Sequence, residues 1–281
     1  MTFDLLSYRV RLSARAPVRF PENTAGNVLR GAIGAMLRKI HCTRECNPEV
    51  SCERRSSCAY AQIFEPRPEH AGPSGFSDWP RPFVLRAAHL SGKTFAREEP
   101  FWFDINLFET RRSNIDVFAE AFGHWANLVS VQTVGLEPKV SIHLVPALLP
   151  VQRLRIHFRT PTELKGASKG RPEFQVLFAR AQDRVSTLRE LYGAGSLSVD
   201  FRAMRSRAAA IRLINCELQH VSASRRSGRT GQVHGIGGFV GFAEYEGALS
   251  EFLPYIEAAR WTGVGRQCVW GKGELAWEVI G

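Results

Sequence analysis

A basic stripe ends in a histidine along one predicted helix. The segment 25–41 has helical spacing and follows Asn23 and Thr24, two residue types that cap helix N-termini. At about 100° per residue, Arg30, Gly34, Arg38 and His41 share one side. The predicted core face carries Leu29, Ile33, Met36 and Ile40. Since guanidinium groups bind phosphates and imidazole titrates near neutral pH, the stripe predicts a phosphate site beside a proton-transfer group. The alternative is a solvated face with an incidental histidine.

A glycine-rich segment, residues 263–273, joins the last predicted helix to the last predicted strand. Glycine permits positive φ and lets backbone N–H groups approach a phosphate closely. A dinucleotide-binding loop is unlikely here, because that motif follows a strand and opens a helix. Trp270 offers a stacking face. The segment predicts nucleic-acid contacts from Gly263, Gly265, Arg266 and Lys272.

A third basic region spans residues 222–234 and has the composition of a hairpin. It carries Arg225, Arg226 and Arg229 between small residues, followed by His234. Two interpretations remain open: a mobile solvated loop, or an arginine arm that becomes ordered on RNA.

Four cysteines lie close together in the first half: Cys42, Cys46, Cys52 and Cys58. Their spacing is less regular than the paired C-x2-C pattern of a zinc ribbon. A small structural zinc site is one hypothesis, and free thiols or an iron–sulfur cluster are the others. If His41 ligated this metal, it would be unable to transfer protons.

Composition indicates a folded, basic protein. Lys and Arg number 37 against 27 acidic residues, a formal charge of +10, which favours polyanionic partners. The most apolar stretch, residues 140–151, is broken by His143, Pro146 and Pro150 and is too short to span a bilayer. We therefore expect a cytoplasmic protein without a membrane partner, in which disulfides are improbable.

Two halves of the chain repeat one order of elements, βαββαβ. The first half is predicted as strand 5–18, helix 25–41, strands 82–90 and 101–108, a helix from Asn114 to about 129, and strand 140–144. The second is predicted as strand 154–158, helix 174–191, strands 211–221 and 238–245, helix 249–261 and strand 274–280. The order predicts an α+β protein of two tandem ferredoxin-like (RRM-like) domains, at 1–147 with a cysteine-rich insertion and at 152–281 with the glycine-rich loop.

Several segments, in this order, resemble the CRISPR repeat-processing endoribonucleases of the repeat-associated mysterious protein (RAMP) superfamily. In the second half they are RTPTELKG at 159–166, GGFVG at 237–241 and the glycine-rich ending at 261–273. In the first half, LRGAIG at 29–34 and the segment 58–66 resemble the family's N-terminal region.

The resemblance implies an RNA-cutting reaction. Such enzymes bind CRISPR precursor RNA and cut once within each repeat, and the substrate's own 2′-hydroxyl attacks the phosphate. The products carry a 2′,3′-cyclic phosphate and a 5′-hydroxyl, and catalysis needs no metal or other cofactor. Family members commonly keep a catalytic histidine on or just after the first helix, which implies His41 as general base or acid. Arg38 or Lys39 would stabilise the phosphate, and Tyr60 is a weaker candidate for orienting the hydroxyl.

Alternatives stay open at this stage. His157 and His234 are reserve candidates for the proton steps. The same basic surfaces would also serve a non-catalytic RAMP subunit that binds guide RNA among other CRISPR effector subunits, and only the histidine placement argues against it. A third class is a basic peripheral membrane or metabolic protein with a structural zinc, because ferredoxin-like folds serve many functions.

Overall fold

A computed structural model describes residues 1–42, 54–66, 79–110, 114–125, 128–167, 171–226 and 231–281 of the chain. The chain forms two compact units, one of residues 5–139 and one of residues 1–4 with 140–281. Residues 1–4 and 140–147, which the sequence analysis assigned to the N-terminal domain, thus belong to the second unit. There the N–H of Leu144 donates to the Met1 carbonyl at 2.9 Å, and Arg189 Nε donates to the Thr2 carbonyl at 2.8 Å.

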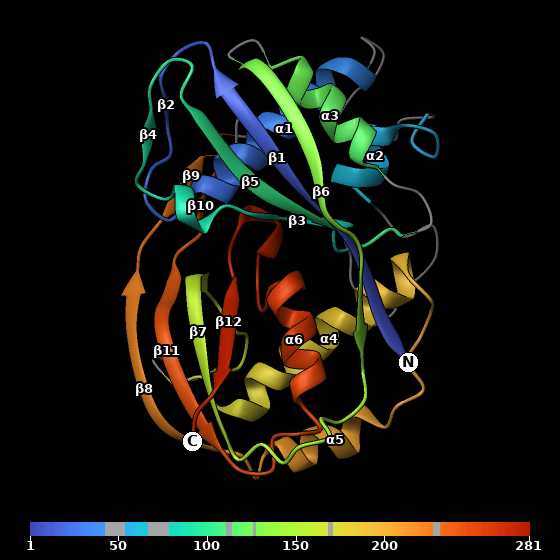
Figure 1. The fold of residues 1–281 in the computed structure, drawn as a ribbon, viewed down its shortest axis with the longest axis vertical. Coiled ribbons are helices and arrows are strands. Elements are labelled where there is room, and N and C mark those ends of the chain that lie inside the picture. The colour runs from blue at the N-terminus through green and yellow to red at the C-terminus, as the bar shows by residue number, and fades with distance from the viewer. Residues whose placement is uncertain (43–53, 67–78, 111–113, 126–127, 168–170, 227–230) are drawn as a thin grey trace. The chain divides into compact units, whose positions relative to one another are not determined.

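The N-terminal unit is built on a four-stranded sheet with the order β3-β5-β1-β6. Its strands are β1 (Thr2–Ala14), β3 (Phe83–Arg86), β5 (Pro100–Leu107) and β6 (Leu128–His143). Strand β5 pairs antiparallel with both β1 and β3. Helices α1 (Ala25–His41) and α3 (Ile115–Gly123) pack together, as Figure 1 shows. Smaller elements are β2 (Val18–Arg19) paired with β4 (Thr94–Phe95), α2 (Ala59–Phe64) and the 3-10 helix η2 (Ala88–Leu90).

Aromatic side chains join α3 to this sheet. Phe118 lies 5.2 Å from Phe83 of β3 between ring centroids, and Phe122 lies 5.5 Å from Phe103 of β5. All four rings are fully buried. The strand that follows α3 is much longer than predicted, because β6 begins at Leu128. The segment 129–134 is rich in β-branched residues, which favour strands over helices, so extending the predicted helix to about 129 was wrong.

The C-terminal unit has an equivalent four-stranded sheet with the order β12-β7-β11-β8. Its strands are β7 (Arg153–Thr162), β8 (Arg212–Val221), β11 (Gly238–Glu246) and β12 (Leu275–Val279). Helices α4 (Phe174–Tyr192) and α6 (Leu253–Thr262) lie side by side (Figure 1). In both sheets the first and third strands of the βαββαβ unit are central, which is the ferredoxin-like arrangement. The predicted fold class is therefore confirmed.

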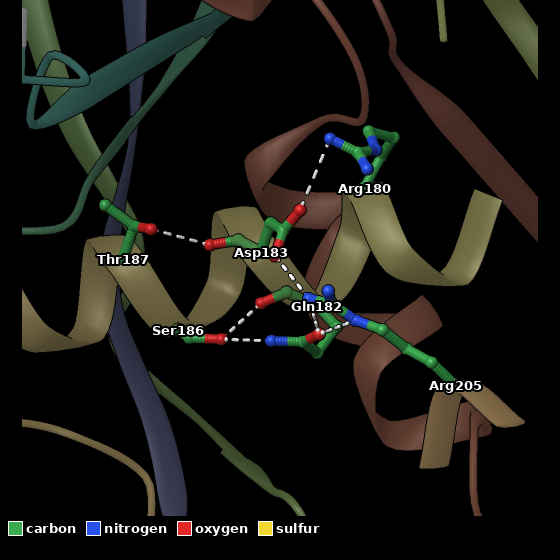
Figure 2. Close-up of polar contacts among 6 residues, drawn as sticks. All are labelled: Arg180, Gln182, Asp183, Ser186, Thr187 and Arg205. Carbon is green, nitrogen blue, oxygen red and sulfur yellow. Dashed lines mark hydrogen bonds and ion pairs between the residues drawn. The ribbon is translucent and has the colours of Figure 1, made fainter. Parts of the chain in front are cut away.

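Helix α5 (Phe201–Ala208) was not predicted, and a polar network fastens it to α4. Arg205 Nε donates to Gln182 Oε1 at 2.7 Å, and the same guanidinium pairs with Asp183 (Figure 2). Gln182 is buried and also donates to Ser186 Oγ at 2.8 Å. The sequence of α5 is short and polar, so it lacks the apolar period that predicts a helix. The contacts that hold it are tertiary and leave no signal in the local sequence.

Candidate functional site

The C-terminal end of α1 carries the basic stripe predicted from the sequence. Arg38, Lys39 and His41 occupy its last turn, where positive charge is favourable beside the helix carbonyl groups. The N–H of Cys42 closes the helix by donating to the Arg38 carbonyl at 2.9 Å. His41 Nε2 is buried and has no hydrogen-bond partner among the residues that the structure describes. Since buried polar atoms are normally paired, this nitrogen has an unfilled hydrogen-bonding position within the described residues.

The buried side of α1 differs from the prediction. Its buried apolar side chains lie four residues apart and are Ala25, Leu29, Ile33 and Leu37. Met36 and Ile40, predicted as core, are half-buried. The buried stripe therefore follows a single i+4 row, and the stated core face was wrong at these two positions.

Helix α2 packs against the basic side of α1 through a small residue. A Cβ at Gly34 would lie 2.8 Å from Phe64 Cε1, so a larger residue would push the ring away. The Arg30 guanidinium lies 5.3 Å from the centroid of the same ring, and Phe64 stacks on Tyr60 at 5.8 Å. The structure thus brings Arg30, Gly34 and Tyr60 together with the stripe.

Tyr60 is already engaged by its own helix end. Its hydroxyl donates to Glu65 Oε1 at 3.0 Å. Burial, and after it the Glu65 carboxylate, raises the pKa of Tyr60 to about 12, whereas the Arg38 charge opposes the shift. Tyr60 is therefore protonated at neutral pH and has committed its proton to Glu65.

The glycine-rich loop holds its two predicted cations on one carboxylate. Arg266 Nη1 lies 2.8 Å from Glu163 Oε1, and Lys272 Nζ lies 3.3 Å from Glu163 Oε2. Burial acts to raise the pKa of Glu163, but the Arg266 hydrogen bond and the Lys272 charge outweigh it and leave that pKa lowered. Lys272 is only 1% exposed and also donates to Gln267 Oε1 at 2.9 Å. Lys272 was predicted to contact RNA, but in this structure its ammonium group binds Glu163 and Gln267 and so stabilises the loop.

Close backbone packing explains the glycines of this loop. Gly265 has φ +84°, and a Cβ there would lie 2.3 Å from the Glu163 carbonyl oxygen. The N–H of Arg266 donates to that carbonyl at 3.0 Å, and the N–H of Gly263 donates to the Ala259 carbonyl at 2.7 Å. Gly263 therefore does not offer its N–H to a phosphate here, contrary to the expectation.

Strands β9 (Ser224–Arg226) and β10 (Val233–Gly235) form the hairpin predicted for the third basic region. The Arg225 guanidinium lies 4.4 Å from the Trp270 ring centroid, and the His234 ring lies 6.2 Å from it. Burial lowers the pKa of Arg225. The structure thus joins the hairpin to the glycine-rich loop, which the sequence analysis treated as separate surfaces. Of the other arginines, Arg226 pairs with Val233 in the register, and Arg229 lies outside the described residues.

The reserve histidine His157 lies in an ion-pair network on the C-terminal sheet. Its Nε2 is 3.2 Å from Glu278 Oε1, a carboxylate that Arg155 also contacts at 3.2 Å. The Arg155 guanidinium lies 5.0 Å from the Phe242 ring centroid. His157 thus has a structural partner, unlike His41 Nε2.

The metal hypothesis stays a prediction. Cys46 and Cys52 lie outside the described residues, and Cys58 forms no disulfide in the described part of the chain. Within the described ranges, no three His, Cys, Asp or Glu residues are grouped so as to hold a metal ion. Among the helices of the described residues, none is long and apolar enough to cross a membrane.

Known proteins match both halves of the chain. Residues 3–132 match a family model described as an N-terminal domain, and residues 156–275 match the model of the CRISPR-associated endoribonuclease Cas6. No curated protein matches the chain.

Solved structures match over nearly the full length. A Cas6 (TTHA0078) product complex has a TM-score of 0.54 and 17% identity, covering 99% of this chain and 100% of that one. Thermus thermophilus Cas6 (TTHB231) has a TM-score of 0.52 and 14% identity, covering 98% and 99%. A partial Cas6-RT-Cas1–Cas2 complex has a TM-score of 0.57 and 11% identity, covering 99% of this chain and 46% of that one. At these identities the likeness shows a common fold. The match to the CRISPR-associated endoribonuclease Cas6 model covers residues 156–275, so the C-terminal domain is similar to that family, and the full chain shares the fold of solved Cas6 structures.

Proposed function

We propose that this chain binds CRISPR precursor RNA and cuts it within each repeat without a metal, leaving 2′,3′-cyclic phosphate and 5′-hydroxyl ends. The observation that carries the proposal is the Nε2 of His41 at the basic end of α1, which is buried and has no partner among the described residues. A proton-transfer group needs such a vacant nitrogen, because a nitrogen already bonded to protein is unavailable to substrate.

The reaction needs only groups that the chain and the RNA supply. The 2′-oxygen attacks the adjacent phosphorus while the bond from phosphorus to the 5′-oxygen breaks. One proton leaves the 2′-hydroxyl, and one arrives on the departing 5′-oxygen. We assign His41 to one of these two transfers, since an imidazole can both accept and donate a proton near neutral pH.

Cations beside His41 would stabilise the charge that develops on the phosphate. Arg38 lies one helical turn before His41, so both side chains leave the same side of α1. Lys39 is exposed in the same turn and remains a second candidate. Tyr60 is better suited to supporting Arg38 and α2 than to accepting a proton, because its hydroxyl proton is held by Glu65.

RNA affinity would come from the basic surfaces. Arg30 on α1, Arg225, Arg226 and His234 in the hairpin, and the exposed Arg266 remain the proposed contacts. The solved Cas6 product complex and a Cas6 substrate mimic complex support a repeat-RNA ligand for this fold. The Cas6-RT-Cas1–Cas2 complex supports proposing other CRISPR proteins as further partners.

The first experiment is cleavage of the cognate repeat RNA in EDTA by the wild type and by His41→Ala. We expect one cut with a cyclic phosphate end, and a loss of about 100-fold or more in the single-turnover rate of the variant, with RNA affinity retained. RNA with a 2′-deoxy nucleotide at the cut site should resist cleavage, because its nucleophile is absent.

His124→Ala is the matched control, since His124 is an exposed histidine of the same unit at the end of α3. It should cleave like wild type. Cleavage that survives His41→Ala would remove His41 from the mechanism, and cleavage lost in EDTA would contradict metal independence. Tight binding without cleavage by wild type would favour the guide-RNA subunit instead.

A further inference from the structure

The basic hairpin is too small to hold its own shape. Strands β9 and β10 contribute three residues each, and isolated two-stranded hairpins are marginal in water even when longer. At its base, the N–H of Ile236 donates to the Ala223 carbonyl at 2.8 Å, and Ile236 is buried. Beyond the base, its geometry must depend on contacts with another element.

One aromatic ring supplies those contacts. Arg225 and His234 face each other across the hairpin, and both lie beside Trp270. The Arg225 guanidinium is over the ring at 4.4 Å from its centroid, within range of a cation–π interaction. Gln267 adds a long hydrogen bond of 3.5 Å to the Gly235 carbonyl. Two of the three hairpin residues proposed to reach RNA, Arg225 and His234, thus lie beside Trp270.

The backbone around Trp270 is held in place by its own hydrogen bonds and by buried side chains. Trp270 ends the 3-10 helix η3 (Cys268–Trp270), which is bounded by left-handed residues at Gln267 (φ 62°) and Gly271 (φ 83°). Its N–H donates to the Gln267 carbonyl at 2.8 Å. Cys268 is buried within the turn. Lys272 donates hydrogen bonds to Glu163 and Gln267, which fix its position. The ring therefore occupies a defined place independent of the hairpin.

We infer that Trp270 is a positioning residue, which holds Arg225 and His234 of the β9–β10 hairpin in the conformation that receives repeat RNA. The inference rests on the proposed function for the identity of the ligand. Preorganisation of this kind increases affinity because less conformational entropy is lost on binding. Trp270 acts through Arg225 and His234, so its removal should release the hairpin before any RNA is added.

The first test needs no RNA. Trypsin cleaves after Arg225 and Arg226 only when the hairpin opens, so the rate of this cut reports its opening. We expect Trp270→Ala to raise that rate about tenfold in the full chain, because a partly buried cation–π contact is lost. Trp270→Phe, which keeps an aromatic face, should stay close to wild type. Trp277→Phe is the matched control on β12, where Trp277 instead donates to Glu257. An unchanged rate in Trp270→Ala would overturn the inference.

The second test is a double-mutant cycle on repeat-RNA affinity. Trp270→Ala and Arg225→Gln should each weaken binding about tenfold, and the double variant should be little weaker than either single one. Single losses that multiply to about 100-fold would mean that Trp270 binds RNA independently, which contradicts a role through Arg225. Thermal melting of each variant identifies any global unfolding. If Trp270→Ala fails to fold, Trp270→Phe still tests the inference. If wild type fails to bind RNA, the proposed function fails, whereas the trypsin result still decides how the hairpin is held.

Discussion

His41 and Tyr60 illustrate how the surroundings of a polar atom divide roles between residues of one site. His41 Nε2 is buried and unpaired within the described part of the chain, so it is available to a ligand. The Tyr60 hydroxyl has its acceptor in Glu65, and Arg38 lies close enough to influence its pKa. The same helix end therefore holds one imidazole nitrogen without a partner in the described residues, which we propose for proton transfer, and one hydroxyl already bonded to Glu65.

Tyr60→Phe should affect stability more than chemistry. Losing the hydrogen bond to Glu65 should lower the free energy of unfolding by about 1 kcal/mol, measured by urea denaturation at pH 7. Because the pKa of Tyr60 is raised from 10.0 to about 12, this contribution is present below pH 10 and is lost as the pH rises towards 12. Single-turnover cleavage should fall far less than in His41→Ala. An equal loss of cleavage in both variants would return Tyr60 to the catalytic group.

At the scale of elements, the packing of α2 against α1 depends on Gly34, which has no side chain. Gly34 allows Phe64 to approach α1, and the Phe64 ring in turn contacts Arg30 and Tyr60. One turn earlier, Gly31 is exposed, and a Cβ there meets no atom within 4 Å. These two glycines share a helix but differ in their surroundings.

Gly31→Ala and Gly34→Ala should therefore shift stability in opposite directions. Gly31→Ala should raise the free energy of unfolding by about 0.5–1 kcal/mol, because alanine is the better helix former. Gly34→Ala gains the same propensity but overpacks against Phe64, so we expect a net loss of about 1 kcal/mol. It should also slow RNA cleavage by displacing α2. Urea denaturation measures both, and a stabilised Gly34→Ala variant with full activity would show that α2 need not sit so close.

The sequence predicted elements better than the contacts between them. Helix α1 begins and ends as predicted, because helical spacing is a local signal, although the Thr24 hydroxyl donates to the Pro21 carbonyl and does not cap the helix. The hairpin of β9 and β10 was likewise expected from its composition. The approach of this hairpin to Trp270 was not predicted, because it depends on tertiary packing against a residue 36 positions after His234. Likewise, the burial of Lys272 depends on Glu163, which is distant in sequence.

At the scale of the whole molecule, the net charge of +10 overstates the surface available to RNA. Several arginines of the C-terminal sheet are already neutralised: Arg153 lies 2.8 Å from Glu246, and Arg155 contacts Glu244 and Glu278. Arg225 instead lies over an aromatic ring and remains able to accept a phosphate. Location therefore matters more than the total charge.

This difference should appear in the salt dependence of RNA binding. Arg225→Gln should reduce the slope of log Kd against log salt by about 0.7–0.9, because one phosphate contact is lost. Arg153→Gln, an equal change in charge, should leave the slope unaltered. Fluorescence anisotropy across a salt series measures both variants. Equal reductions would mean that RNA responds to overall charge and not to the hairpin.

The first strand has a consequence for how the protein could be divided. Its first three residues, together with Met1, belong to the C-terminal unit, where Ser141 Oγ donates to Asp4 Oδ1 at 2.8 Å and Arg189 donates to the Thr2 carbonyl. These partners are separated by 137 and 187 positions. A ribosome completes the strand long before it makes the residues that hold its beginning. No single cut of the backbone therefore yields two self-sufficient fragments, since the later fragment would always lack the opening residues that complete it.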